Sequence, residues 1–407
     1  MKKVFMLLAA VACIAVSCKK EVKGPVLTPD QNKTTLDETM SKAVELLEVE
    51  NWQETADLIT ASAVALENVE PDQSVKSWIE GIEDSWMKEE GGVTVTTINL
   101  EDLKGALTAG DSLSVASAND LSLSYNLEDG SAVVAKMNVK NSKTTLLTDE
   151  YYTYYDAEGK YVEEGILRDQ TYLIVPALLE ANVTAAGKKA ANVKITTDLS
   201  IAGDVPAITD KMSATATVSA GSYTFAVTRA KYSNTEVALD ASIKYGKTTV
   251  VAAKFEAKGK IEGEGQEIDP FSSTGKVNAS FSVLDNVVLK GSLDWTAYME
   301  LSKQEFESTE EGVKAVCAAL EKIVNLTLYI QNTAQAKLGF EAIEYTDVEE
   351  PYWAWIPVVR FEDGSQYALP EEFFNPEGFP KTMEAVEKAL GELQAFLGGP
   401  EAEELEK

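Results

Sequence analysis

A long stretch in which apolar and polar residues alternate, from about residue 93 to 301, constrains the fold of this chain more than any other feature. In Leu121–Leu127 every second residue is apolar and the residues between them are Ser or Asn. A period of two is typical of β-strands with one apolar and one polar face, and turn signals such as Asp129-Gly130 separate the segments. The pattern predicts a large antiparallel sheet. Its apolar face has to be covered by helices, by a second sheet or by curling of the sheet on itself.

Helical patterns stand on both sides of this stretch. Apolar residues recur at helical spacing over residues 36–88, where Asn51-Trp52-Gln53-Glu54 resembles a capping box and Pro71 precedes a third apolar stripe. Ser308-Thr309-Glu310-Glu311 and Pro380 mark two later helix starts. We therefore predict an α+β fold: a large curved antiparallel sheet, a meander or half-barrel, with N-terminal and C-terminal helices packed against it.

Acidic residues far outnumber basic ones. The chain has 36 Lys and Arg against 66 Asp and Glu, a net charge of −30. Removal of residues 1–17 would take away Lys2 and Lys3 and no acid, which gives −32. A negative field of this size repels phosphate backbones, so nucleic acid is excluded as a partner. The charge is typical of a soluble surface, or of a protein that attracts cations or basic partners.

Histidine is absent from the whole sequence. This excludes Ser-His-Asp and Cys-His nucleophiles, imidazole-ligated zinc and proton transfer through imidazole. Cys317 lies in the middle of an apolar helical stripe, which predicts a buried core residue. We expect no catalytic residues and no cofactor. The abundance of acids leaves one enzymatic alternative, a glycosidase-type pair of carboxylates.

The N-terminus has the pattern of an export signal. Lys2 and Lys3 precede an apolar run from Val4 to Val16, which is too short to span a bilayer as a helix. Ala15-Val16-Ser17-Cys18 follows, and it resembles the lipobox of bacterial lipoproteins cleaved by signal peptidase II, including Bacteroides-type outer-membrane and surface lipoproteins. The resemblance implies cleavage between Ser17 and Cys18 and attachment of lipid to Cys18. Ala15 departs from the Leu that is favoured at its position.

The residues after the lipobox suggest where the protein is anchored. Lys19 stands where Asp would favour the inner membrane, so the resemblance implies a lipid-anchored envelope protein of the outer membrane, on its periplasmic face or at the cell surface. Residues 19–35 are polar and contain Pro25 and Pro29, which predicts a flexible tether. We therefore divide the chain into a signal peptide (1–17), a lipidated tether (18–35), a helical region (36–91) that ends at Gly91-Gly92, an antiparallel β domain (92–306) and a C-terminal α+β region (307–407) that is separate or packs on the same core.

Two aromatic groups are candidate ligand-binding residues: Tyr152 and Tyr154 in one strand, and Tyr352, Trp353 and Trp355 in another. Surface glycan-binding lipoproteins stack such rings on sugar faces, while nearby acids bond sugar hydroxyls. The competing interpretation is an aromatic-rich, half-buried strand, which β propensity alone favours.

Four acids, Glu262, Glu264, Glu267 and Asp269, cluster in a glycine-rich segment. Carboxylate oxygens at this density are weak Ca²⁺ candidates, although the spacing of an EF-hand is absent. A solvated loop is the competing interpretation, and we predict no metal as a constituent.

Three functional hypotheses follow. The first is a non-enzymatic envelope lipoprotein that binds an apolar or glycan ligand, with an apolar pocket formed by the curved sheet. The second is a structural or accessory subunit of an outer-membrane assembly, for which a glycan-related assembly is one option, and it would contact an outer-membrane protein. The third is a carboxylate-dependent hydrolase. An apolar pocket, an exposed aromatic platform or a close carboxylate pair would favour the first, second and third respectively.

Overall fold

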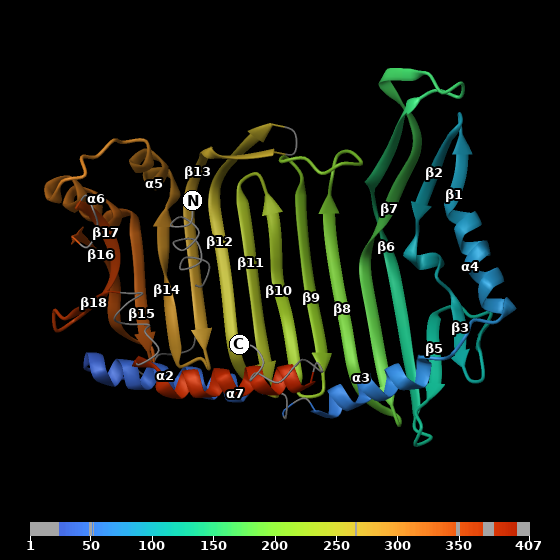
Figure 1. The fold of residues 1–407 in the computed structure, drawn as a ribbon, viewed down its shortest axis with the longest axis horizontal. Helices are drawn as coiled ribbons and strands as arrows, with labels where there is room; N and C mark the ends of the chain where they lie inside the picture. Colours follow the sequence, from blue (N-terminus) through green and yellow to red (C-terminus); the bar gives the residue numbers. More distant parts are fainter. Residues whose placement is uncertain are drawn as a thin grey trace. The chain divides into compact units, whose positions relative to one another are not determined.

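The computed structural model describes residues 24–48, 51, 53–264, 267–346, 351–368 and 378–396 (Figure 1). The chain is α+β and forms two compact units. Unit 1 contains the described residues up to Asn51, Ser222–Phe225 and those from Asn234 onward, and unit 2 contains Trp52–Gly221 and Ala226–Ser233. Strand β10 (Tyr223–Ser233) contributes residues to both.

Unit 1 is built on an open sheet in which each strand pairs antiparallel with the next along the chain. Hairpin turns join most neighbours, and Gly246 and Gly364 adopt positive φ at two of them. The strands are β11 (Glu236–Tyr245), β12 (Thr248–Glu264), β13 (Glu267–Val283), β14 (Val287–Asp294), β15 (Val324–Ile330), β16 (Thr333–Tyr345), β17 (Tyr352–Phe361) and β18 (Gln366–Ala368).

Two helices between β14 and β15 cover one face of this sheet. They are α5 (Trp295–Ser302), which is capped by Asp294, and α6 (Glu310–Ile323), whose N-cap is Thr309. The apolar sides of α5 and α6 pack on β13–β17 and form the main core of unit 1. Its buried members are Ala279, Leu293, Val313, Cys317, Leu320, Val324, Leu326 and Phe340. The C-terminal region therefore shares a core with β13 and β14.

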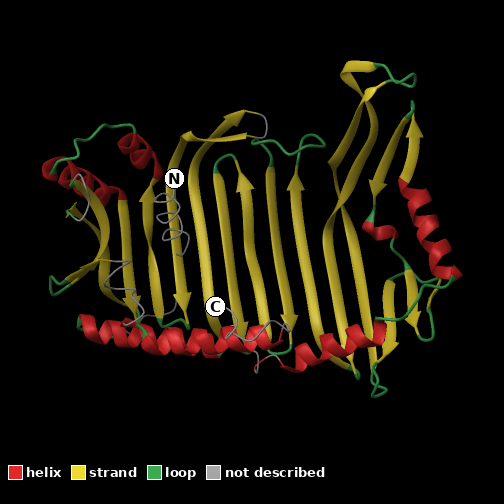
Figure 2. Ribbon diagram, in the orientation of Figure 1, coloured by secondary structure: helices red, strands yellow, loops and turns green. Residues whose placement is uncertain are grey.

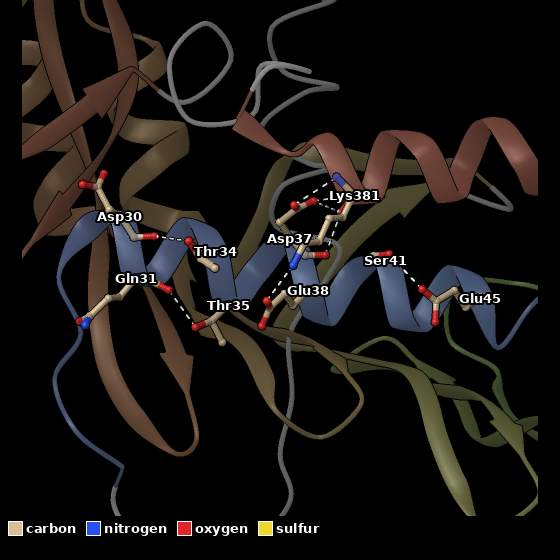
Figure 3. Close-up of polar contacts among 10 residues, drawn as sticks. Asp30, Gln31, Thr34, Thr35, Asp37, Glu38, Ser41, Glu45 and Lys381 are labelled. Carbon is tan, nitrogen blue, oxygen red and sulfur yellow. Dashed lines mark hydrogen bonds and ion pairs between the residues drawn. The ribbon is translucent and has the colours of Figure 1, made fainter.

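Two further helices of unit 1, α2 (Pro29–Glu45) and α7 (Pro380–Phe396), pack against each other. The buried carboxylate of Asp37 in α2 accepts bonds from the backbone N–H of Lys381 (3.2 Å) and of Thr382 (2.8 Å) at the start of α7 (Figure 3). Since the first N–H groups of a helix have no partner inside it, Asp37 serves as the N-terminal cap of the other helix. Lys388 adds an ion pair with Glu48 at 2.7 Å.

The chain before α2 is attached to the sheet of unit 1. The backbone N–H of Gly24 donates to the Gln331 carbonyl at 3.1 Å. The side chain of Gln335, only 1% exposed, accepts from the Leu27 N–H and donates to the Pro25 carbonyl. Residues 24–35 thus differ from the predicted tether: 24–27 are bound to β15–β16, and 29–35 are the first two turns of α2.

Unit 2 begins with α3 (Gln53–Leu66) and α4 (Gln73–Trp86) and continues as an open sheet that Figure 2 shows as its dominant element. The strands from β5 to β9 pair antiparallel in order. Parallel pairing of β2 with β7 and of β3 with β5 makes the sheet mixed. Its elements are β1 (Met87–Glu90), β2 (Val93–Ile98), the short helix η2 (Leu100–Asp102), β3 (Gly105–Ala109), β4 (Leu113–Ala116), β5 (Leu121–Asn126), β6 (Ala132–Tyr155), β7 (Tyr161–Ala185), β8 (Lys188–Ser200) and β9 (Lys211–Ala220).

The sheet of unit 2 has one apolar and one polar face, as the alternation predicts. Cross-strand rows over β5–β9 place apolar side chains opposite one another, because directly paired residues share a face. We name this set the apolar face of unit 2. Its rows are Leu123–Ala135–Val183–Ala191–Ala220, Leu121–Met137–Ala181–Val193–Val218, Val139–Leu179–Ile195–Ala216 and Leu199–Met212. None of these residues is buried by the described part of the chain, whereas Val133, in the next row of the same face (Tyr125–Val133–Ala185–Lys188), is 0% exposed.

The α+β class and the large, mainly antiparallel sheet are confirmed, but three local predictions differ from the structure. Trp295, Ala297 and Met299, which lie within the alternating stretch predicted as strands, form α5, since Asp294 caps a helix there. The change from helix to strand occurs at Met87, and Gly91-Gly92 is the turn between β1 and β2, with both φ angles positive. The cap of α6 is Thr309 bonded to Gly312, one residue later than the predicted box.

Candidate functional site

The end of the β6–β7 hairpin, residues 150–168, is a two-stranded ribbon that we name the tyrosine arm. Strand β2 pairs with β7 from Asp169 to Leu173, so the arm begins where this support ends. Beyond Asp169, toward the tip, β7 pairs with β6 alone among the described strands, and Figure 1 shows the hairpin projecting past β2 and β8. Irregular register near Tyr151 and Thr153 adds local twist to the ribbon.

Five tyrosines are exposed on this arm. The exposed fraction is 44–60% for Tyr151, Tyr152, Tyr154, Tyr155 and Tyr161. The rings of Tyr154 and Tyr161 are stacked with centroids 6.3 Å apart, and Tyr155 meets Tyr161 edge-on at 6.0 Å. None of the five hydroxyls forms a hydrogen bond with the described part of the chain. The arm therefore presents both aromatic surface and unused hydroxyl groups to solvent.

Gly165 explains how two of these rings lie against the ribbon. Its φ of +70° is in the left-handed region, and a Cβ there would lie 3.3 Å from Cε1 of Tyr154 and 3.6 Å from Cβ of Tyr152. A glycine is therefore favoured by both backbone conformation and space. The rings of Tyr152 and Tyr154 pack over the bare backbone in place of a cross-strand side chain.

The tip of the arm is held by Asp156. Its carboxylate accepts hydrogen bonds from the backbone N–H of Glu158 at 3.1 Å and of Lys160 at 2.8 Å. Gly159, with φ of +78°, completes the turn. These bonds fix the register in which Tyr155 is opposite Tyr161, so the tip is an ordered turn that positions the rings.

The arm is also acidic. Residues 150–168 contain five carboxylates and two cations, Lys160 and Arg168. Glu150 accepts a hydrogen bond from Gln170 at 2.9 Å, which ties the two strands together at the base of the arm. Rings with carboxylates beside them suit a ligand that offers both apolar C–H faces and hydroxyl donors.

The structure separates the other aromatic candidates. Trp353 and Trp355 pack against the main core of unit 1, and Trp355 meets Phe340 edge-on at 5.6 Å. Tyr352 is 46% exposed and stacks on Tyr345 at 5.2 Å. These three residues therefore do not form one platform, whereas Tyr152 and Tyr154 do lie together. The sequence did not indicate that Tyr161 belongs to this group, because its pairing with Tyr155 depends on the length of the turn between them.

The four acidic candidates share one face at the end of the β12–β13 hairpin, since Glu262 pairs with Asp269 and Glu264 with Glu267. They border a hollow of about 480 Å³. Glu262 is paired with Lys260, and Asp269 accepts from the hydroxyl of Ser272 at 2.6 Å. No group of three or more potential metal ligands is close enough to hold an ion within the residues described. The Ca²⁺ hypothesis gains no support.

A second hollow, of about 370 Å³, lies in unit 2. Hydroxyl groups and small side chains dominate its lining, and Thr196 and Thr215 are hydrogen-bonded across it at 2.6 Å. It does not correspond to the predicted apolar pocket, because Asp198, Arg229 and Lys231 also line it.

Cys18 and Ser17 lie outside the described residues, so lipidation there stays a prediction. None of the helices described here is long and apolar enough to cross a membrane. Cys317 is buried in the core of unit 1, and burial raises the pKa of its thiol, with a smaller contribution from Glu321.

Comparison with known proteins gave no match, whether to protein-family models, to curated sequences or to solved structures.

Proposed function

We propose that this chain is an envelope lipoprotein without a catalytic role, anchored through Cys18 to the outer membrane, whose tyrosine arm binds glycans. The single observation that supports this is the set of five exposed tyrosines with unused hydroxyls on a projecting, ordered hairpin. Aromatic rings stack on the C–H faces of sugars, and carboxylates accept bonds from sugar hydroxyls.

Affinity gel electrophoresis tests the binding role. The mature chain would be run through gels that contain starch, xylan, pectin or mannan. We expect retardation by at least one polysaccharide, and a double variant Tyr154→Ala/Tyr161→Ala should weaken it about tenfold or more, since each ring contributes about 1 kcal/mol. Tyr352→Ala is the matched control, because Tyr352 is similarly exposed but lies in unit 1.

Two results would contradict this role: no retardation by any of the four polysaccharides, or equal binding by the double variant and the wild type. The hydrolase alternative predicts instead that the retarding polysaccharide is cut, which chromatography of the products would show.

The anchoring is tested separately. Mass spectrometry of the mature N-terminus should show a diacylglyceryl group on Cys18, and a Cys18→Ser variant should leave the membrane fraction. A Cys18→Ser protein that still sediments with membranes would contradict lipid anchoring.

A further inference from the structure

A row of directly paired polar residues crosses the sheet of unit 1 on the face opposite the main core. On the neighbouring strands β14, β15 and β16 it reads Lys290–Thr327–Lys337 (Figure 1). Directly paired residues share one side of a sheet, and the sequence neighbours Leu326 and Leu338 belong to or pack against the main core on the other side. We name these three residues the cationic row.

The hydroxyl of Thr327, at the centre of the row, is buried without a partner. Thr327 is 7% exposed, and its hydroxyl forms no hydrogen bond within the described part of the chain. Ser280 continues the row on β13, opposite Lys290, and its Oγ is also buried without a partner among the residues described. Because most buried hydroxyl groups in proteins are hydrogen-bonded, these two indicate a ligand that accepts hydrogen bonds.

The two lysines of the row are not neutralised by acids. The amine of Lys290 lies over the ring of Tyr329, 4.2 Å from its centroid, and Lys337 is exposed. Neither amine forms an ion pair with a carboxylate of the described ranges. By contrast, Lys276 on the same face of β13 is paired with Asp294 at 3.6 Å. Two positive charges therefore stand on either side of the Thr327 hydroxyl without a counter-ion from the described chain.

The residues that flank the row along its strands, on the same face, are uncharged. They are Val288, Ser292, Asn325, Tyr329 and Gly339. Arg360, which pairs with Lys337 on β17, is a further cation and is bound to Glu321. At physiological salt, charges more than about 8 Å away are largely screened. The net charge of −30 therefore repels a long polyanion but does not cancel this local attraction for one small anion.

We propose that the cationic row binds a phosphate group, which Lys290 and Lys337 hold from both sides while the Thr327 hydroxyl donates to one of its oxygens. With strands about 4.8 Å apart, the Cα atoms of the two lysines lie about 10 Å apart, so their flexible side chains can meet over Thr327. A lysine amine is a compact charge with three donors, which suits the acceptor oxygens of phosphate. The contact of Lys290 with Tyr329 is a weak cation–π contact, which the amine can exchange for an anion.

Isothermal titration calorimetry with inorganic phosphate tests the proposal, on the mature chain without lipid (residues 19–407) in a buffer of low ionic strength. We expect one saturable site with a dissociation constant of about 1 mM or tighter. Lys290→Gln/Lys337→Gln should weaken binding about tenfold or more, because it removes both counter-ions. Thr327→Val should weaken binding several-fold without lowering the melting temperature, since no described group bonds to this hydroxyl.

Lys276→Gln is the matched control. It makes the same change of charge on the same face of the sheet, but Lys276 is already paired with Asp294, so this variant should bind phosphate as the wild type does. The arm variant Tyr154→Ala/Tyr161→Ala should also bind phosphate normally. Failure of this proposal is therefore distinct from failure of glycan binding, and the chain without lipid makes it distinct from failure of anchoring.

Vesicles distinguish two sources of the phosphate group. If the ligand is a lipid head group, the same protein should sediment with vesicles of phosphatidylglycerol. Lys276→Gln should then sediment as well, and Lys290→Gln/Lys337→Gln should not. If the ligand is a soluble phosphate ester, inorganic phosphate should bind and the vesicles should not. Either result agrees with the site.

Three outcomes would overturn the proposal. The first is no saturable binding of phosphate up to about 10 mM together with no sedimentation. The second is equal binding by the wild type and by Lys290→Gln/Lys337→Gln. The third is an equal loss of binding in Lys276→Gln, which would mean a diffuse attraction to any cation of this face.

Discussion

The two units show the same alternating sequence pattern with different means of burying its apolar face. In unit 1 the helices α5 and α6 together cover β13–β17, so Leu326 and Phe340 are 5% and 1% exposed. In unit 2 comparable residues, such as Val193 and Leu179, stay half-buried, and Val133 is the member of the same face that is fully buried. Alternation therefore indicates which face avoids water, but the cover depends on elements that lie elsewhere in the sequence.

The largest expected effect is the loss of unfolding free energy when one leucine in each unit is replaced by alanine. Leu326→Ala, in the core of unit 1, should lower the free energy of unfolding by about 2–5 kcal/mol, because it leaves a cavity. Leu173→Ala in unit 2, where Leu173 is half-buried between Leu146 and Ile98, should cost about 1 kcal/mol. Urea unfolding at low protein concentration measures both. Equal costs would mean that unit 2 has an additional cover.

The next effect concerns how unit 1 holds its C-terminal helix. Asp37→Asn should destabilise the docking of α7 by about 2 kcal/mol, since the amide would turn a donor toward the N–H groups of Lys381 and Thr382. Asp30→Asn, at an exposed position of the same helix (Figure 3), is the control and should destabilise by only a few tenths of a kcal/mol. Hydrogen exchange at Thr382 and Met383 measures the difference. Unchanged exchange in Asp37→Asn would contradict the capping role.

Glycine substitutions should have opposite signs in the two units. Gly165→Ala in the arm should destabilise by about 1 kcal/mol, because an L-residue is strained at its φ of +70°. Gly391→Ala in α7, where a Cβ would meet nothing within 4 Å, should stabilise by up to about 1 kcal/mol. Thermal unfolding measures both. Stabilisation by Gly165→Ala would show that the arm does not keep this backbone in solution.

The smallest expected effect is a loss of stability at alkaline pH, and it concerns unit 1 alone. Burial, with help from Tyr245 and Glu48, raises the pKa of Tyr223 to about 12, and its hydroxyl bonds to the Leu46 carbonyl. The folded state favours the neutral phenol, so this stabilisation is complete below pH of about 10 and is lost as pH rises from about 10 to about 12. Melting temperatures from pH 9 to 12 should therefore fall less steeply for Tyr223→Phe. Parallel curves for variant and wild type would contradict this assignment.

Local signals in the sequence predicted much of this fold. The Asp-Gly turns at Gly130 and Gly364, the helix start at Pro380 and the burial of Cys317 agree with the structure, because each depends on a few adjacent residues. The start of α2 could also have been found. Thr28 and Gln31 form a complete capping box around Pro29, whereas we interpreted this proline as part of a flexible segment.

The remaining features depend on contacts between distant residues. The parallel pairing of β2 with β7 brings together residues about 75 positions apart, and no local pattern encodes it. Trp353 and Trp355 are shielded from solvent by the core that α6 helps to form, and in the sequence β15 and β16 separate this helix from the two tryptophans. Tyr152 and Tyr154 were predicted as neighbours because a strand places alternate residues on one side, but their projection beyond the sheet follows from where β2 ends.

The attachment of Gly24–Leu27 to the β15–β16 hairpin limits how far the folded part of the chain can lie from a lipid anchor at Cys18. With lipid on Cys18 as proposed, five residues, Lys19–Lys23, would separate the lipidated residue from Gly24, and a chain of five residues spans at most about 18 Å. The β15–β16 hairpin would then lie close to the lipid head groups, although its orientation toward them would not be fixed. A Gly/Ser insert after Lys20 would increase this distance without changing any residue that contacts the fold.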